Sequence, residues 1–315
     1  AVHGLHLLLV QLEFLRSVKL DVCCLLFQVA FKGGDARVLP CVLQLHVRLK
    51  NNKNIKFNED AFCSHRWFTH FYIISVLWNG FLLIELFQAK FLGAALPPWM
   101  QHLHSVFGRD LQSQNTGKYS SYSDSEHFSA LLVLLLLWLH SFRRLAECLC
   151  TSVFSNGVIH VVQYCFGLGY YIVLGTTVLW QVPINVRHGK GSSMQICWYH
   201  VVGIVVYIWA SLHQHRCLVI LANLRKSKSG KVVSLTHSIP FGDWFERVSC
   251  PHYFAELLIY VSMAITLGLD NVTWWFVVTY VLFNQALVAV LCHEFYQKKF
   301  TSYPKHRKAF IPFVF

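Results

Sequence analysis

The sequence predicts an all-α integral membrane protein, a bundle of seven transmembrane helices, or six if its first apolar stretch does not span. Of its 315 residues, 55% are hydrophobic and only 13% are charged, whereas soluble domains carry about 25% charged residues. The mean hydropathy is +0.44. Several apolar stretches also approach the ~20 residues that cross ~30 Å of hydrocarbon as a helix. Most of the chain is therefore expected to face lipid.

Six apolar stretches are expected to form transmembrane helices. They lie near residues 69–89, 128–142, 158–182, 196–221, 253–269 and 272–292. A seventh stretch, 5–30, is interrupted by Glu13, Arg16, Lys19 and Asp21. It is either a poor first span or a helix that lies in the membrane interface.

The basic residues predict the orientation of these spans. Of the 27 Lys and Arg residues, 20 fall on one side if the spans alternate, in four groups: 32–66, 143–144, 216–247 and the segment after 297. Basic loops stay in the cytosol. The C-terminus and the 216–252 segment are therefore expected to be cytosolic, and the N-terminus lumenal if the first stretch spans. This distribution also accounts for the formal charge of +12 without a nucleic-acid partner.

Two polar breaks separate the spans. Residues 97–127 are rich in Ser, Gln and Asn without a motif, which predicts a flexible lumenal loop. Residues 222–252 combine basic residues with Gly, Pro and the aromatic side chains Phe241, Trp244 and Phe245. This composition indicates a folded cytosolic loop, and such loops often carry function.

Several chemistries lack their motifs in this sequence. The chain has 18 His residues, but the pairs His102/His104 and His213/His215 have i, i+2 spacing, which points to different sides of a helix. No HExxH, clustered His box or zinc-type Cys spacing is present, so no metal site is predicted. GxGxxG and Walker loops are also absent. A nucleotide cofactor would have to be held by helix ends and loops of a non-Rossmann fold.

Ionisable residues within or at the ends of apolar spans are functional candidates, because burying them in lipid costs several kcal/mol. The candidates are Glu85, His140, His160, His200, His213, Glu256 and His293. A single His at a helix end is often only a satisfied structural residue. Glu256 is different, since it lies one turn into an apolar span with no local cation. It requires a donor from a neighbouring helix or from a ligand.

Long motifs in the second half of the chain resemble the steroid 5-alpha-reductase family. They are HSIPFGDWFERVSCPHYFAELLIY at 237–260 and HEFYQKKFTSYPKHRKAFIPFVF at 293–315. Upstream, LWLHSFRRLAECL at 137–149, HVVQYCFGLGYY at 160–171 and LANLRK at 221–226 fit the same family. HFYIISVLWNGFLL at 70–83 is similar to its polyprenol/polyprenal reductase branch. The resemblance covers residues 65–315, which defines a reductase domain, whereas residues 1–64 match poorly.

This resemblance implies a seven-helix enzyme of the endoplasmic reticulum membrane that holds NADPH in a site opening to the cytosol. It implies reduction of a carbon–carbon double bond conjugated to a carbonyl. The implied substrate is a long-chain polyprenyl lipid, polyprenal, whose product leads to dolichol for protein N-glycosylation. A partner dehydrogenase acting on polyprenol and dolichal is also implied, because hydride addition requires a carbonyl whereas the end product is an alcohol.

The resemblance also assigns site residues. The positions that correspond to the cofactor lining are Trp67, Asn223, Arg225, His252, Glu256, His293, Tyr296 and Arg307. Arg225 and Arg307 suit phosphate, since a planar guanidinium pairs with two phosphate oxygens at once. For polarising the substrate carbonyl, the candidates are His293 and Tyr296, with His140 third.

The sequence departs from the family at three positions. Steroid-reducing members grip the substrate carbonyl with a Glu and a Tyr, but the corresponding residues are Phe71 and Ser141. His252 stands where Asn is common. Three alternatives remain open: a reductase of 3-oxo-4-ene steroids, which the missing pair disfavours; an enzyme similar to isoprenylcysteine methyltransferases, using S-adenosylmethionine; and a non-catalytic lipid-binding scaffold, in which Glu256 would have no use.

Overall fold

Six apolar helices form the body of the protein. The structure is a computed structural model that describes residues 62–64, 68–107, 118–154, 158–179, 196–227 and 229–314. The helices are α3 Phe68–Phe87, α5 Lys118–Ala146, α6 Val161–Leu179, α7 Trp198–Asn223, α8 Pro251–Leu267 and α9 Val272–Lys299. Each overlaps one of the six predicted spans, so the helical structure of these stretches is confirmed, whereas the number of helices that cross the membrane stays a prediction. The seventh stretch, 5–30, lies outside the described residues, and the count of seven stays a prediction.

Four of these apolar segments are long enough to cross a membrane: 68–92, 125–151, 198–223 and 272–299. The other two apolar helices, α6 and α8, are shorter. Apart from short π-helical and 3-10 turns, the other described elements are the helix α4, Pro98–Phe107, and one antiparallel ladder of β1, Phe62–Ser64, with β2, Val158–His160. The all-α membrane fold is therefore the one that the sequence predicts.

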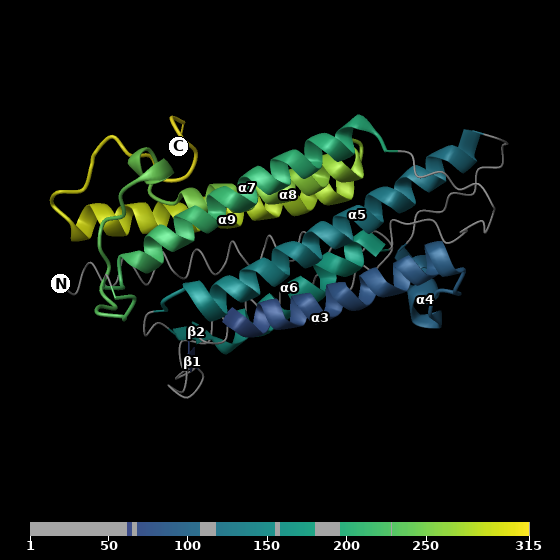
Figure 1. Ribbon diagram of the computed structural model, residues 1–315, viewed down its shortest axis with the longest axis horizontal. Coiled ribbons are helices and arrows are strands. Elements are labelled where there is room, and N and C mark those ends of the chain that lie inside the picture. Colours follow the sequence, from purple (N-terminus) through teal and green to yellow (C-terminus); the bar gives the residue numbers. More distant parts are fainter. Residues whose placement is uncertain are drawn as a thin grey trace, which may run out of the picture.

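The helices lie side by side in two groups with their axes roughly aligned (Figure 1). Helix α3 packs against α5 and α6, helix α8 packs against α7 and α9, and α5 joins the groups through α8. At the α7–α8 contact, a Cβ added to Gly203 would lie 2.1 Å from Thr266 Oγ1. Glycine at this position therefore lets the two backbones approach closely, as small residues do between membrane helices.

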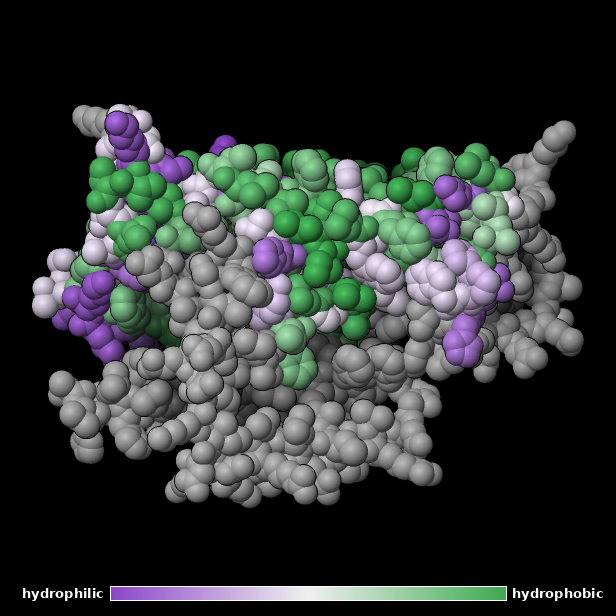
Figure 2. Space-filling model, turned by 90° about the horizontal axis from the view of Figure 1, so that it is seen from below, coloured by the Kyte–Doolittle hydropathy of each residue, from purple (hydrophilic) through white to green (hydrophobic). Residues whose placement is uncertain are grey.

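Apolar side chains occupy both the core and the outer face of the bundle. Leu82, Leu134, Leu137 and Ile259 are fully buried where the helices meet. Outward-facing positions are apolar too, such as Leu77 and Val205, with 67% and 60% of their surface exposed. On the face seen in Figure 2, hydrophobic residues lie mainly over the middle of the molecule and hydrophilic ones gather toward its two ends. This distribution is what a lipid-embedded bundle requires.

The prediction of a flexible loop over residues 97–127 is wrong in its described part. Helix α4 occupies Pro98–Phe107, and α5 begins at Lys118, ten residues before the predicted span. Proline favours the first turn of a helix because its fixed φ suits the helix and its missing N–H is not needed there. Trp99 and Met100 follow it, and Met100 is only 3% exposed. The polar composition of the segment concealed this short amphipathic pattern.

The predicted folded loop between α7 and α8 is confirmed. It contains the 3-10 turn Asp243–Glu246, and the side chains of Phe245 and Val248 are fully buried. The C-terminal segment lies on this loop, since Ser249 N donates to Lys308 O at 2.8 Å and Lys308 N donates to Arg247 O at 2.9 Å. Both segments lie at the end of the bundle where α9 ends (Figure 1).

Candidate functional site

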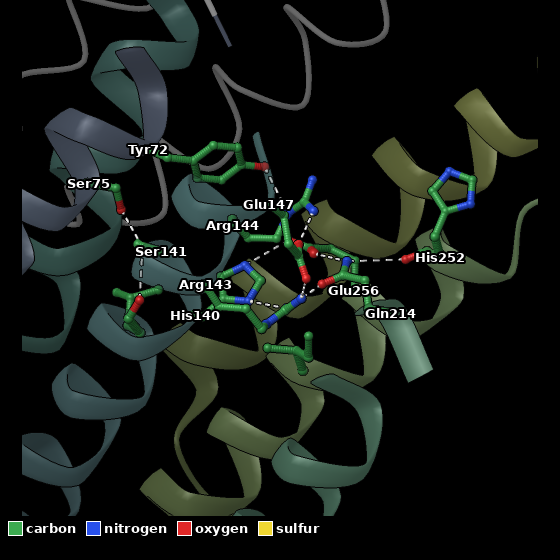
Figure 3. A network of polar contacts seen from close by, with 12 residues as sticks. Tyr72, Ser75, His140, Ser141, Arg143, Arg144, Glu147, Gln214, His252 and Glu256 are labelled. Atoms are coloured by element: carbon green, nitrogen blue, oxygen red, sulfur yellow. Dashed lines mark hydrogen bonds and ion pairs between the residues drawn. The ribbon is translucent and has the colours of Figure 1, made fainter. Parts of the chain in front are cut away.

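A network of buried polar side chains lies between α3, α5, α7 and α8 (Figure 3). At its centre, Glu256 of α8 uses both carboxylate oxygens. Its Oε1 is 3.2 Å from His140 Nε2 of α5, and its Oε2 accepts a hydrogen bond from Gln214 Nε2 of α7. The three residues are 9%, 0% and 3% exposed. Glu256 therefore has the donors from neighbouring helices that its place in an apolar span requires.

Arg143 determines the proton positions on His140. Its guanidinium lies 3.3 Å from His140 Nδ1 and also donates to Gln214 Oε1. Because a guanidinium can only donate hydrogen bonds, Nδ1 is the acceptor and Nε2 carries the proton that is donated to Glu256. Both ring nitrogens of His140 are thus engaged. This arrangement suits holding the carboxylate better than polarising a substrate.

A second buried carboxylate anchors the arginine pair on α5. Arg143 NH1 donates to Glu147 Oε1 at 2.7 Å, and Arg144 NH1 donates to Glu147 Oε2 at 2.5 Å. His215 Nδ1 lies 3.0 Å from the same Oε1. Glu147 is only 2% exposed. The charges of the two partly buried guanidinium groups balance those of the buried carboxylates of Glu147 and Glu256, which makes burial of the carboxylates tolerable.

The network reaches α3 through Arg144. Its Nε lies 3.3 Å from the hydroxyl oxygen of Tyr72, and its guanidinium carbon lies 5.3 Å from the centre of the Tyr72 ring. Nearby, Ser141 Oγ lies 2.6 Å from Ser75 Oγ and donates to Leu137 O. The Ser141 hydroxyl is therefore used within the protein.

A second polar cluster lies where α9 meets the C-terminal segment. Ser249 Oγ is 2.6 Å from both His293 Nδ1 and Tyr303 OH, and Gln297 Nε2 is 2.8 Å from His293 Nε2. Because the Gln297 amide nitrogen donates, His293 Nε2 is the acceptor, and His293 Nδ1 carries the proton that points toward Ser249. Tyr296 stacks on Tyr303 with ring centres 5.5 Å apart. His293 thus ties α9 to the α7–α8 loop and to the C-terminal segment.

Arg307 is a buried cation with hydrogen-bonding capacity to spare. It is 2% exposed, donates from NH1 to Pro240 O at 2.8 Å and lies over the ring of Phe241. Its NH2 is 3.8 Å from Glu246 Oε2, but Nε and NH2 have no hydrogen-bond partner. Such groups are costly to bury unpaired. The unused donors fit an anionic ligand such as a phosphate.

Basic residues also meet around the start of the α7–α8 loop. Arg225 NH1 donates to Val153 O, and Lys226 Nζ donates to Thr151 O at 3.1 Å. Partial burial, together with the nearby charges of Arg225 and Lys299, holds the pKa of the His237 imidazole below its usual range. This end of the protein is therefore electropositive. A phosphate-bearing ligand would find cations here and at Arg307.

The structure thus divides the predicted site residues between two clusters. His140, His252 and Glu256 belong to the bundle network, where the His252 carbonyl accepts from Gln214 at 3.3 Å and the buried His252 Nδ1 has no hydrogen-bond partner. His293, Tyr296 and Arg307 belong to the C-terminal cluster.

The remaining predicted residues lie apart. Arg225 is in the basic region at the start of the loop, Asn223 is exposed at the end of α7, and Trp67 lies outside the described residues.

Sequence reasoning missed five members of the bundle network. Arg143, Arg144 and Glu147 were noted only within a family motif or as topology signals, and Gln214 and Tyr72 only as ordinary residues of their spans. A signal was present, because Arg143 and Glu147 have the i, i+4 spacing of a helical ion pair. An amide in an apolar span, as at Gln214, also needs partners. No sequence pattern showed that Tyr72 meets Arg144.

Comparisons with known proteins place this arrangement in a family. The family model described as 3-oxo-5-alpha-steroid 4-dehydrogenase matches residues 157–315. A human protein named polyprenal reductase is 58% identical over 254 residues, covering 79% of this chain and 77% of its own. A protein of the same name from Rattus norvegicus is 51% identical over 306 residues, covering 92% and 91%. One from Xenopus tropicalis is 57% identical, covering 79% of each chain.

Proposed function

Because this chain belongs to the 3-oxo-5-alpha-steroid 4-dehydrogenase family and is 58% and 51% identical to two polyprenal reductases over the aligned residues, we propose that it reduces polyprenal. The protein is a membrane-embedded oxidoreductase that acts on a carbon–carbon double bond. The bond is the α,β double bond of the α-isoprene unit, and the product leads to dolichol. The observation that carries this proposal is the high identity to polyprenal reductases, which covers 79% of this chain for the human protein and 92% for the rat protein.

The structure offers support against a steroid substrate. At the two positions where steroid-reducing relatives hold the carbonyl, this chain has Phe71, which has no polar side-chain atom, and Ser141, whose hydroxyl is engaged with Ser75 and Leu137 O. A 3-oxo-4-ene steroid remains the second candidate because of the description of the matching family model.

One assay tests the function. Purified protein in detergent is supplied with NADPH and either polyprenal or a 3-oxo-4-ene steroid, and the saturated products are quantified. Saturated aldehyde from polyprenal supports the proposal. Steroid reduction alone would replace it with the second candidate. Copurification of S-adenosylmethionine in place of a nicotinamide cofactor would favour the methyltransferase-like alternative.

The residues present fit a nicotinamide cofactor, which supplies a hydride when bound. Arg307, with its unpaired buried donors, and Arg225 are proposed to bind phosphates, and Asn223 and Trp67 are proposed to be further cofactor-binding residues. His252, whose Nδ1 is buried without a partner, and Glu256 are proposed to orient the cofactor from within the bundle. The electropositive end around Arg225 and Arg307 is then the entrance, facing the cytosol.

The two predicted catalytic histidines receive different roles. His140 is proposed to hold Glu256, because both of its ring nitrogens are engaged within the network. His293 is proposed to hold the Ser249–Tyr303 contact, and with Tyr296 it keeps the C-terminal segment carrying Arg307 in place. These roles concern geometry at the cofactor. The group that contacts the substrate carbonyl must then be sought elsewhere.

NADPH is expected to be preferred over NADH. The basic residues Arg225, Lys226 and Arg307 can pair with a 2′-phosphate, and each charged hydrogen bond contributes roughly 1.5–3 kcal/mol, so kcat/KM should favour NADPH by about tenfold or more. Initial rates at sub-saturating cofactor measure this ratio. Arg225→Ala should reduce it, whereas Arg216→Ala, an exposed arginine of α7, should leave it unchanged. Equal rates with both cofactors in the wild type would contradict the prediction.

His293→Ala is expected to lower kcat/KM for the cofactor by about thirtyfold, since two hydrogen bonds of ~1 kcal/mol each are removed. The protein should still insert and accumulate, because the apolar helices do not depend on this side chain. A matched control is His306→Ala, an exposed histidine of the C-terminal segment. Steady-state kinetics with varied NADPH make the comparison. Normal turnover of His293→Ala would exclude His293 from the site and leave Tyr296 as the residue proposed to hold the C-terminal segment.

Location and partners are proposed from the same chemistry. A lipid aldehyde partitions into a bilayer, and the endoplasmic reticulum is the proposed membrane because N-glycosylation uses the product. The C-terminus is proposed to be cytosolic, since most of the basic residues that the structure describes lie at its end of the bundle. A C-terminal tag protected from protease in intact microsomes would contradict this orientation. Residues 65–315 form the proposed reductase domain.

A further inference from the structure

The substrate carbonyl needs a hydrogen-bond donor. Phe71 and Ser141, which stand at the two positions that bind the carbonyl in steroid-reducing relatives, do not provide one. Phe71 is packed among aromatic rings, with its centre 5.3 Å from that of Tyr164, and the Ser141 hydroxyl is engaged. When hydride adds to the β carbon of an enal, the π electrons move toward the carbonyl and negative charge appears on its oxygen. A placed donor that stabilises this oxygen is usually a large part of catalysis.

A candidate donor lies next to both positions. Tyr72 follows Phe71 on α3, and Arg144 lies one helical turn after Ser141 on α5. Tyr72 OH and Arg144 Nε are 3.3 Å apart. Tyr72 is only 9% exposed, so a hydrogen bond from its hydroxyl would form away from bulk water. At the α3–α5 contact, the Tyr72 phenol therefore lies beside the Arg144 guanidinium. Both residues are close in sequence to Phe71 and Ser141, the positions at which steroid-reducing relatives have the Glu and Tyr that bind the substrate carbonyl.

Hydrogen-bond chemistry leaves the phenol proton available. Arg144 can only donate, so the Tyr72 oxygen accepts from Nε and its own proton points to a different acceptor. The Tyr171 ring lies beside the Tyr72 ring, with ring centres 5.6 Å apart. A substrate carbonyl next to the Tyr72 hydroxyl can accept this proton. Glu147 holds the Arg144 guanidinium in place, and Arg144 in turn fixes the position of the Tyr72 hydroxyl oxygen.

We propose that Tyr72 donates the hydrogen bond to the carbonyl oxygen of the lipid aldehyde and that Arg144 is its positioning residue. This inference rests on the proposed reduction of polyprenal. Hydride forms the new C–H bond at the β carbon, the α,β double bond shifts to the α carbon and the carbonyl carbon, and the oxygen becomes an enolate held by Tyr72. Protonation of the α carbon from water then restores the carbonyl.

Tyr72→Phe tests the assignment, because it removes one oxygen and keeps the ring against Arg144 and Tyr171. Loss of one oxyanion donor should lower kcat about 10²–10³-fold. Binding of NADPH, followed by its fluorescence without turnover, should stay within twofold. The matched control is Tyr164→Phe, the same change at the α3–α6 contact, where the hydroxyl pairs with His70. It should lower kcat less than threefold.

A second measurement does not depend on how Tyr72→Phe folds. Replacing Tyr72 with 3-fluorotyrosine, a more acidic phenol, should move the alkaline limb of the pH–rate profile to lower pH, a change that a packing role would not cause. An unchanged profile, or a Tyr72→Phe enzyme within threefold of wild type, overturns the inference. Wild-type protein that does not reduce polyprenal at all would instead overturn the proposed function, so the two failures are distinguishable.

Discussion

Purified protein with NADPH is expected to reduce polyprenal at least about 10³-fold faster than polyprenol, the combined scale of an oxyanion donor and its surroundings. Hydride adds to an alkene carbon readily only when the charge that appears on the neighbouring carbon can move onto an oxygen. An enal provides that oxygen. An allylic alcohol does not, and its reduction would pass through a localised carbanion that no hydrogen-bond donor near the head group can stabilise.

The measurement is a time course with each lipid separately and no other dehydrogenase present. As a control, adding an alcohol dehydrogenase with an oxidised nicotinamide cofactor should allow polyprenol to be consumed, because the alcohol is first converted to the aldehyde. The enzyme would then depend on a partner activity that oxidises polyprenol and later reduces the saturated aldehyde. Stoichiometric dolichol from polyprenol with the purified enzyme alone would contradict this expectation.

Glu256→Gln is expected to lower kcat/KM by at least about a hundredfold, because it disrupts two hydrogen bonds to a charged group, each of which contributes about 1.5–3 kcal/mol. The substitution keeps the size of the side chain but removes the charge that faces His140 and, through the network, Arg143 and Arg144. If the new amide nitrogen replaces Oε2, it faces the Gln214 amide nitrogen, and two hydrogen-bond donors then point at each other. The network would then lose the balance of its two carboxylates and two guanidinium groups, and with it the proposed orientation of the cofactor.

The control for this variant is Glu294→Gln, the same substitution on α9. Within the described part of the chain, Glu294 pairs with Lys298 one turn away, at 3.1 Å, and this contact is exposed. It should retain activity within twofold, since exposed pairs contribute little. Both proteins should accumulate in membranes to similar levels, measured by quantitative blotting before kinetics. Glu256→Gln with normal kcat/KM would remove the bundle network from the site and leave the cluster around His293 and Arg307.

Parts of the site could be predicted from single residues. Glu256 stood out because an ionised side chain in an apolar span must have a partner, and the structure supplies two. Arg307 was chosen for its chemistry and its motif, and it proved to be buried with unpaired donors. The split of the predicted residues into two clusters was not foreseeable, since nothing in the sequence states how far Glu256 lies from His293.

Local composition misled the prediction where polar residues form regular structure. The stretch 97–127 contains helix α4 and the first turns of α5, because a helix satisfies its own backbone hydrogen bonds whether or not its side chains are apolar. The motif LWLHSFRRLAECL was interpreted as a family marker and a topology signal. Its two arginines instead point inward and bind Glu147, because its i, i+3 and i, i+4 spacings bring them to one face of the helix.

The sequence by itself determined that this is a helical membrane protein, where its six described apolar helices lie, and to which family it belongs. The length and hydropathy of a segment determine whether it can enter lipid, and long sequence motifs identify the family. Only the tertiary structure decided that His140, Gln214 and Glu256 meet from three helices and that Tyr72 faces Arg144. Hydropathy is nearly the same around an apolar helix, so it does not fix the rotation of each helix. Side-chain packing between helices fixes that rotation, and with it which polar groups come together.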